Sequence, residues 1–427
     1  MPQQEDPGAD PHGQRDEAEQ RQPGSRDSQD RGPDDGTEPE HEDRCCDLAL
    51  SDSGVPLDGG GDQLAAEGDE TVDVGAGKGP DSKEGGIEGG RSDDGTVAPP
   101  ATVQAMAAAA RSRAPDDDQL LRAAEIIAAV LPPSPLVEAS VSGRRLWLKL
   151  ESLQPTGSFK VRGALAALAA AAAEDPATEI VACSAGNHGL GVAFAAARLG
   201  TRATVVVPMT ASPAKLARLR EFDVELQLVG AGYEQAETHA QVLAEQRGAR
   251  FVSPYDDDWV IAGQATMAAE VLVQRPSAAR LIVGVGGGGL AAGSILATRG
   301  SEVIVHGVQL EQNAAFAAAL AGRQIDPAAL GSTIADGIAG GIDASSITLQ
   351  ILRSARFELS LVSEAATRTA LAACAHDAGL VIEGSAAAAL AAALERPGSE
   401  EGETVVAISG RNIATELLGE LLGTQTL

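Results

Sequence analysis

One unit recurs along most of the chain: a short apolar run, a turn that contains glycine, and a stretch with apolar residues at helical spacing. The clearest apolar runs are residues 179–183, 203–208, 224–229, 281–285, 303–308 and 404–409. Strands that alternate with helices in this way predict parallel sheets with helices on both faces, which is an α/β fold. In such folds, ligands bind where the C-terminal ends of strands lead into helices. We therefore expect the functional residues in the turns that follow these runs.

The first hundred residues have a different character. They contain 27 acidic and 8 basic side chains and no aromatic residue, and they supply most of the chain's formal net charge of −29. A segment of this composition cannot bury enough apolar surface to offset the entropy that is lost on folding. We predict a disordered acidic low-complexity tail over residues 1–115, within which Met106 offers an alternative start.

Composition excludes several classes of protein. The N-terminus lacks the basic segment and apolar core of a secretory signal, and no apolar run is long enough to span a bilayer. No basic patch suggests a nucleic-acid partner. Cys45, Cys46, Cys183 and Cys374 lack metal-binding spacing, which is typical of a reducing compartment. We expect a cytoplasmic protein that binds neither membranes nor nucleic acid.

Lys160 stands between a Gly-Ser-Phe turn and a long alanine-rich helical run. The start of a helix offers unpaired N–H groups and positive dipole character, which together with burial lower the pKa of an ammonium group. A free amine at such a place can form a Schiff base with a carbonyl cofactor. Most lysines are solvated surface residues, so the other turns must decide.

Two further turns have the composition of anion sites. Ser184-Ala-Gly-Asn-His-Gly189 follows an apolar run and opens a helix, where backbone N–H groups can hold a carboxylate or a phosphate. Gly284-Val-Gly-Gly-Gly-Gly-Leu290 does the same with four successive glycines, which predicts phosphate binding. The second turn also satisfies the dinucleotide fingerprint, although the nearest acid after the next strand is Glu311. A nicotinamide-binding protein therefore stays an alternative at this point.

Ser409 ends the last apolar run, before the final helix. A serine there either meets a heterocyclic nitrogen or simply caps the helix.

Together these segments resemble the fold type II pyridoxal-phosphate enzymes, the tryptophan-synthase-β type, and among them the threonine/serine dehydratases. The matching segments are residues 155–164, 184–189, 286–290 and 409–412, joined in the same order by 335–339 and 383–386. The resemblance covers residues 116–427. It implies two three-layer parallel-sheet domains, a large one over 116–182 and 263–427 and a small one over 183–262, and a homodimer.

The resemblance also implies roles for individual residues. Lys160 would form the Schiff base with pyridoxal 5'-phosphate and act as the general base. The other cofactor contacts would be Phe159, Asn187, Gly286, Gly287, Gly288, Gly289, Leu290 and Ser409, with Asn187 on the ring oxygen and Ser409 on the pyridine nitrogen. The substrate contacts would be Ser158, Ser184, Ala185, Gly186 and His188. Gly337 and Glu383 would lie near the ring.

The implied reaction is β-elimination, in which L-threonine or L-serine gives a 2-oxo acid and ammonia. Alternatives are a threonine synthase-type reaction, β-replacement, and a non-catalytic ligand-binding homologue. Serine racemases of this group have a serine directly before the Gly-Asn-His turn, and Ala185 at that position cannot move a proton. Racemisation therefore ranks low.

Three departures from the family pattern have consequences. Arg411 stands where the last motif usually has its second glycine. Gln309 and Ala315 stand where some relatives have metal-binding carboxylates, so we expect no metal site. The chain ends soon after Asn412, so we expect no C-terminal regulatory domain.

Overall fold

The computed structural model describes residues 113–323, 329–396 and 402–423. All of them belong to the unit that runs from Gly90 to Leu427. The predicted acidic tail lies outside the described residues except for residues 113–115, as do Cys45 and Cys46. Among the described helices, none is long and apolar enough to cross a bilayer.

Six strands form the larger sheet, in the order β1-β2-β10-β7-β8-β9. Their bounds are Leu136–Val141 (β1), Arg144–Lys149 (β2), Glu403–Ala407 (β10), Ala278–Gly284 (β7), Ile304–Leu310 (β8) and Phe357–Val362 (β9). All neighbours pair in parallel except β1 and β2, which form an antiparallel hairpin. Ser142 and Gly143 turn this hairpin with positive φ angles of 49° and 74°. The expectation of a parallel sheet is therefore confirmed with one difference, the antiparallel strand β1 at its edge.

Four parallel strands form the smaller sheet, in the order β5-β4-β3-β6. They are Ile180–Cys183 (β3), Ala203–Val207 (β4), Glu225–Leu228 (β5) and Arg250–Phe251 (β6). Along β3, Ile180 and Ala182 pack into one core and Val181 and Cys183 into another, so both faces of the strand are buried. This is why the run reads as continuously apolar in the sequence.

Helices cover both faces of the smaller sheet. One face packs against α3 (Lys160–Glu174), α4 (Asn187–Leu199) and α5 (Pro213–Leu219), beside α2 (Asp117–Val130). The other face packs against α6 (Tyr233–Arg247).

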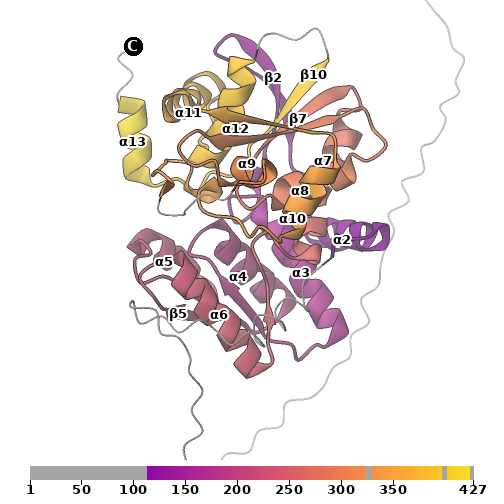
Figure 1. Cartoon of the computed structure of the whole chain (residues 1–427), viewed down its shortest axis with the longest axis vertical. Helices are drawn as coiled ribbons and strands as arrows, with labels where there is room; N and C mark the ends of the chain where they lie inside the picture. The colour runs from indigo at the N-terminus through magenta and orange to yellow at the C-terminus, as the bar shows by residue number, and fades with distance from the viewer. Residues whose placement is uncertain (1–112, 324–328, 397–401, 424–427) are drawn as a thin grey trace, which may run out of the picture. The chain divides into compact units, whose positions relative to one another are not determined.

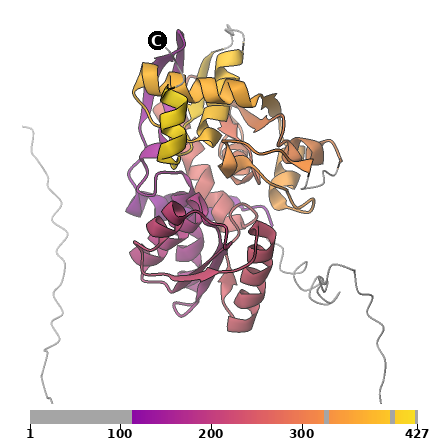
Figure 2. The ribbon, with the colours of Figure 1, turned by 90° about the vertical axis from the view of Figure 1, so that its left-hand side faces the viewer.

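The larger sheet is also covered on both faces. One core joins it to α11 (Glu364–Ala378), α12 (Gly384–Glu395) and α13 (Thr415–Gly423). The other joins it to α7 (Asp258–Gln274), α8 (Gly289–Ala297), α9 (Ala315–Leu320) and α10 (Ile347–Ser354). Short 3-10 turns lie at Glu151–Leu153 (η1) and Asp336–Ile338 (η3). Figures 1 and 2 show the two groups of helices and strands from two sides, and each sheet has the predicted three layers.

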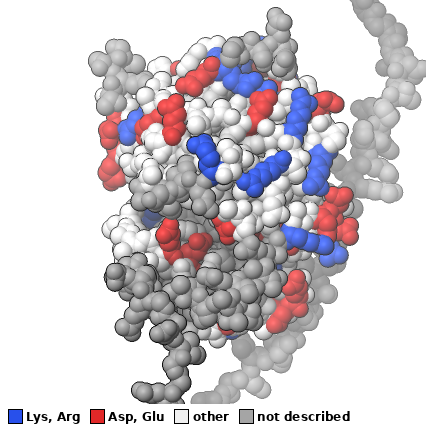
Figure 3. All heavy atoms as spheres, viewed as in Figure 1, with Lys and Arg blue, Asp and Glu red and all other residues white. Residues whose placement is uncertain are grey.

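Charged side chains of both signs lie on one face of the molecule (Figure 3). Lys and Arg side chains lie among Asp and Glu side chains on the face of the molecule in Figure 3. Both signs are therefore present on this face, as is usual for solvated helices.

The predicted domain boundaries can be placed on these elements. The boundary between residues 182 and 183 falls inside β3, and the boundary between 262 and 263 falls inside α7. Helix α3, which precedes the first boundary, packs against α4 and the four-stranded sheet. The division into a large and a small domain stays a prediction.

Close contacts between helix backbones hold α3 in place. A Cβ atom on Gly191 of α4 would lie 3.0 Å from the carbonyl oxygen of Lys160. A Cβ atom on Gly263 of α7 would lie 2.5 Å from the carbonyl oxygen of Arg162 and 2.7 Å from Cα of Gly163. A Cβ atom would be tight at Gly191 and would force a shift at Gly263, so the position of Lys160 depends on small residues in two neighbouring helices.

Substitution of Gly263→Ala is therefore expected to destabilise the protein. The added methyl group must push α3 and α7 apart, and overpacking of this kind costs about 1–3 kcal/mol. Urea unfolding of the two proteins measures the difference. The matched control is Gly419→Ala in α13, where a Cβ atom meets nothing within 4 Å. Equal unfolding free energies for Gly263→Ala and the parent would contradict this account of the helix contacts.

Candidate active site

The turns that follow strands of both sheets line one cavity of about 800 Å³. It lies where β3 leads into α4, where β7 leads into α8, and after β10, which are C-terminal ends of parallel strands. Nearly all the residues that the sequence predicts for the site line this cavity. They are Phe159, Lys160, Ser184, Ala185, Gly186, Asn187, His188, Gly286, Gly287, Gly288, Gly289, Leu290 and Ser409.

Ser158 differs from the other predicted site residues. It is fully buried, it is not part of the cavity lining, and its Oγ has no hydrogen-bond partner among the described residues. Its role in substrate binding stays a prediction.

Lys160 is the first residue of α3, and its amine is held at the cavity wall. Its Nζ donates to the carbonyl oxygen of Pro254 at 2.6 Å and lies 5.2 Å from the centre of the Phe159 ring. Burial lowers the pKa of Lys160 to about 8, and the negative charge of Glu383 opposes this fall. A substantial fraction of the amine is therefore neutral near pH 8 and can act as a nucleophile or a base.

Asn187 begins α4 and is bonded to residues far away in the sequence. Its Nδ2 donates to both carboxylate oxygens of Glu383, at 2.9 and 3.0 Å. Its Oδ1 accepts from Nδ2 of Asn412 at 2.5 Å. Protein groups therefore orient both Nδ2 and Oδ1 of Asn187 without any ligand.

Glu383 lies at the start of α12 and carries a perturbed carboxyl group. Burial raises the pKa of Glu383 to about 7, the nearby charge of Asp336 adds to the rise, and the bonds from Asn187 oppose it. The carboxyl group therefore changes charge near neutral pH, inside the cavity.

The raised pKa predicts a pH-dependent stability. A carboxyl group whose pKa rises from 4.5 to about 7 on folding contributes stability that is full below pH 4.5 and is lost as the pH rises through 7. For the protein without cofactor, the loss amounts to about 3 kcal/mol over this window. Glu383→Gln has no such group, so the difference in unfolding free energy between the two proteins should change by this amount from pH 4.5 to 7. A pH-independent difference would contradict the raised pKa.

His188 follows Asn187 and is neutral. Its Nε2 bonds to the carbonyl oxygen of Val252 at 3.0 Å, and its Nδ1 is buried without a partner among the described residues. Burial lowers the pKa of His188 to about 3, and the charge of Lys160 lowers it further. In the same turn, the amide N–H of Gly186 donates to Oγ of Ser184 at 3.1 Å. The other N–H groups at the start of α4 have no partner within the helix, as in an anion site.

The glycine loop, residues 286–289, lines the same cavity. Gly288 has a φ of +86°, and a Cβ atom on Gly287 would lie 2.2 Å from the ring of Tyr255. The hydroxyl of Thr348 donates to the carbonyl oxygen of Gly287 at 2.7 Å and fixes the loop from behind. The loop thus presents bare backbone at the N-terminus of α8, where the helix dipole favours an anion.

Two serine hydroxyls lie on the side of the cavity formed by the larger sheet. Ser409 lines the cavity after β10, and its carbonyl oxygen accepts from the amide N–H of Phe159 at 3.0 Å. Ser385 also lines the cavity, and its Oγ is buried without a partner among the described residues. A buried hydroxyl without a partner is costly, which points to a polar ligand in this cavity.

Several residues of the site were not assigned a contact from the sequence. Asn412 and Glu383 belong to recognised motifs, yet their bonds to Asn187 join residues 225 and 196 positions apart. Lys215 and Arg218 of α5 line the cavity within an ordinary amphipathic helix that carries no motif. Tyr255 follows β6, and no sequence signal separates it from a packing residue.

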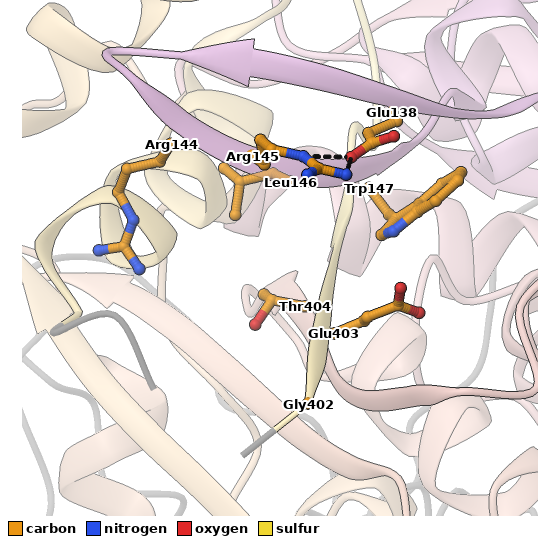
Figure 4. A pocket seen from close by; sticks show the side chains of 8 residues that line it. All are labelled: Glu138, Arg144, Arg145, Leu146, Trp147, Gly402, Glu403 and Thr404. Carbon is orange, nitrogen blue, oxygen red and sulfur yellow. Dashed lines mark hydrogen bonds and ion pairs between the residues drawn. The ribbon is translucent and has the colours of Figure 1, made fainter. Parts of the chain in front are cut away.

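Another hollow, of about 440 Å³, lies at the opposite end of the larger sheet (Figure 4). It is formed by β1, β2 and the start of β10, and its ion pair joins Arg145 to Glu138. The N-terminal ends of the parallel strands lie there, so it shares none of the turns that carry the predicted site.

Gln309 stands at one of the two positions for which the resemblance predicts no metal ligand. It is buried, and its Oε1 accepts from the backbone N–H of Ala317 at 2.8 Å. Within residues 113–323, 329–396 and 402–423, no three His, Cys, Asp or Glu side chains form a metal-binding group.

A buried lysine amine and a bare glycine loop in one α/β cavity suit a phosphorylated carbonyl cofactor that is held through a lysine. The model of the pyridoxal-phosphate dependent enzyme family matches residues 127–410. An L-threonine ammonia-lyase of Geobacter sulfurreducens is 38% identical over 277 residues, which are 64% of this chain and 68% of that protein.

Two solved structures show the same fold. A threonine deaminase from T.th. is 34% identical, with a TM-score of 0.63 over 70% of this chain and 99% of that one. Maize serine racemase is 27% identical, with a TM-score of 0.67 over 72% of this chain and 96% of that one. The chain belongs to the pyridoxal-phosphate dependent enzyme family, and pyridoxal phosphate is its cofactor.

The residues present fit this cofactor. The glycine loop leaves a cradle that side chains would fill, since Cβ atoms on Gly287 and Gly288 would meet Tyr255 and Phe316 at 2.2 and 2.5 Å. Lys160 supplies an amine at the same cavity, and Ser385 offers an unpaired hydroxyl. The loop and the amine fit the phosphate and the carbonyl group of the cofactor, and the hydroxyl fits a further polar atom of a ligand.

Proposed function

We propose that this protein is a pyridoxal-phosphate-dependent ammonia-lyase that converts L-threonine to a 2-oxo acid and ammonia. The observation that carries the proposal is the buried amine of Lys160, with a pKa lowered to about 8, in one cavity with the glycine loop. Relatives named as L-threonine ammonia-lyases and threonine deaminases support the choice of substrate. L-serine differs from L-threonine by one methyl group, and we infer that it is a second substrate.

Separate turns of the cavity would bind the cofactor and the substrate. Residues 286–289 and the start of α8 would hold the phosphate, and the hydroxyl of Ser409 would bond to the ring nitrogen. The backbone N–H groups at the start of α4, with Ser184, bind the substrate carboxylate. Pyridoxal phosphate, when bound, takes up the negative charge that develops at the substrate's α-carbon.

Lys160 is the group that we propose for proton transfer at the substrate's α-carbon. Its neutral Nζ would accept the proton from the α-carbon, and the resulting ammonium would supply a proton to the departing hydroxyl group. Phe159 and Leu290 line the same cavity and limit the water around that amine. His188 is neutral and buried against Val252, so it orients the turn rather than moving protons.

Ala185 supports elimination over racemisation. Its side chain lines the cavity in the turn before Asn187 and has no group that can donate a proton. A racemase needs a base on one side of the α-carbon and an acid on the other, and Lys160 supplies one side only.

The substrate is tested by offering L-threonine, L-serine and their D-forms to the purified protein. The proposal predicts equal amounts of 2-oxo acid and ammonia from the L-forms and little D-serine from L-serine. Inversion of L-serine that outpaces ammonia release would replace the proposal with racemisation. A visible cofactor band without any product would keep the cofactor and redirect the search for a substrate.

We further infer a cytoplasmic homodimer. Cys183 and Cys374 are free and buried, which fits a reducing compartment. The dimer rests on family resemblance alone. Light scattering of the eluting protein tests it, with a mass of about twice 43.2 kDa expected and the monomer mass as the contrary result.

A further inference from the structure

A directed chain of hydrogen bonds runs through the active site from Arg218 to Glu383. Nη1 of Arg218 donates to Oδ1 of Asn412 at 2.6 Å. Nδ2 of Asn412 donates to Oδ1 of Asn187 at 2.5 Å. Nδ2 of Asn187 donates to the two oxygens of Glu383 at 2.9 and 3.0 Å. We call these four side chains the amide relay.

The two ends of the relay determine its direction. An arginine can only donate, and an ionised carboxylate can only accept. The amide oxygen of Asn412 must therefore face Arg218, and its N–H groups must face Asn187. Asn187 in turn must present its oxygen to Asn412 and its N–H groups to Glu383.

A side-chain amide without such end groups could turn by 180° and exchange its oxygen and nitrogen. The same orientation also directs the second N–H of the Asn412 amide. This N–H donates from Nδ2 to the carbonyl oxygen of Thr156 at 2.9 Å. Nη2 of Arg218 reaches the same carbonyl oxygen at 3.4 Å. The relay thus also holds the loop that leads to Lys160.

The relay joins elements of both sheets. Arg218 on α5 and Asn187 on α4 pack with the four-stranded sheet. Asn412 and Glu383 belong to the segment after β10 and the start of α12, on the six-stranded sheet. The chain of bonds therefore crosses three times between the two groups of elements, and it is complete only when α5 lies close to Asn412.

We propose that Arg218 is a positioning residue, which fixes the direction in which Asn187 presents its amide N–H groups to Glu383 and to the cofactor ring. Arg218 is not a catalytic residue, because it acts through Asn412 and Asn187. The proposal deepens the proposed function, and it rests on that function only for what the N–H groups meet when the cofactor is bound.

The charge of Glu383 reports the state of the relay. Asn187 stabilises the ionised carboxylate through its two bonds, against burial that favours the neutral acid. The charged groups that face Glu383 from the neighbouring elements are Asp336 on η3, Lys215 on α5 and Lys160 on α3. If the amide of Asn187 turns over, Glu383 keeps the backbone N–H of Asn412 at 3.1 Å but loses the bonds from Asn187, and its pKa must rise.

Three variants separate the direction of the relay from the charge of Arg218. Arg218→Met removes the donor and the charge, whereas Arg218→Lys keeps both. Lys215→Met removes a charge that acts on Glu383 from the same helix but takes no part in the relay, since its Nζ bonds to Asp336 at 2.8 Å.

The experiment is a side-chain NMR titration of the full-length protein with its cofactor. Glutamate carboxyl carbons carry ¹³C and asparagine amides carry ¹⁵N, and Glu383→Gln and Asn187→Ala assign the two signals. In Arg218→Met we expect the midpoint of Glu383 to rise by about one pH unit and the Asn187 amide protons to lose their hydrogen-bonded shift. Arg218→Lys should restore both signals, and Lys215→Met should keep the amide shift of the parent.

An unchanged Asn187 signal and Glu383 midpoint in Arg218→Met would overturn the inference. So would the same loss of the amide shift in Lys215→Met, because charge alone would then explain it. The readout follows the protein's own side chains. If the parent protein showed no cofactor band, the proposed function would be contradicted. The NMR titration would still decide whether Arg218 orients Asn187.

Discussion

Lys160→Ala is expected to lower kcat/KM for L-threonine by about 10³-fold or more, since it removes the group that takes the proton from the α-carbon. The variant should fold as the parent does, because the Lys160 side chain makes one bond, to the carbonyl oxygen of Pro254. Steady-state release of 2-oxo acid measures the loss, and a thermal unfolding scan checks the fold.

Lys160→Arg is the matched control for this prediction. It keeps a long cationic side chain but cannot become neutral, since the guanidinium pKa lies far above the working range. We expect it to be as inactive as Lys160→Ala. If Lys160→Arg retained a tenth of the parent's activity, a positive charge rather than a free amine would be what the site requires.

Arg162→Met is expected to lower the free energy of unfolding by about 3–5 kcal/mol, because it leaves the fully buried carboxylate of Glu151 without its bonded cation. Arg162 is fully buried. It bonds to Glu151, also fully buried, at 2.8 Å and to Glu270 at 2.6 Å. Lys149, the remaining buried cation of this cluster, is held by Glu270. Together these charges connect β2, η1, α3 and α7. Arg162 is two residues after Lys160 in the sequence, so the cluster also supports the start of α3.

Urea unfolding of Arg162→Met and of the double variant Glu151→Met with Arg162→Met tests this account. The double variant should recover part of the loss, because it removes a buried charge together with its partner. Arg220→Met, which removes an exposed arginine, should stay within about 0.5 kcal/mol of the parent. A loss below about 1 kcal/mol for Arg162→Met would show that the cluster is better solvated than its burial indicates.

The sequence predicted the parts of the fold and site that depend on local pattern. The runs 281–285, 303–308 and 404–409 fall on β7, β8 and β10, because buried parallel strands read as continuous apolar runs. The turns at 184–189 and 286–290 open α4 and α8 as expected, because both follow a strand end and contain glycine. The antiparallel strand β1 was not expected, since its residues alternate weakly and only pairing with β2 makes it a strand.

The connections across the cavity could not be predicted in the same way. Asn187 pairs with Glu383 and Asn412 because two sheets bring separate turns together, and no local pattern records that arrangement. Arg218 reads in the sequence as one more cation on an amphipathic helix. The buried pair of Arg162 and Glu151 reads as two ordinary charges until the packing of α3 is known. Such contacts follow from tertiary structure, and they set the pKa values on which the chemistry depends.

The central claim is that Lys160 holds pyridoxal phosphate in the cavity. The most direct measurement is an absorbance spectrum of the full-length protein with the cofactor, followed by borohydride reduction and peptide mass spectrometry. The account predicts a visible band that borohydride removes and a stable cofactor adduct on the peptide that contains Lys160. The absence of a band at saturating cofactor, or an adduct confined to other lysines such as Lys215, would contradict it.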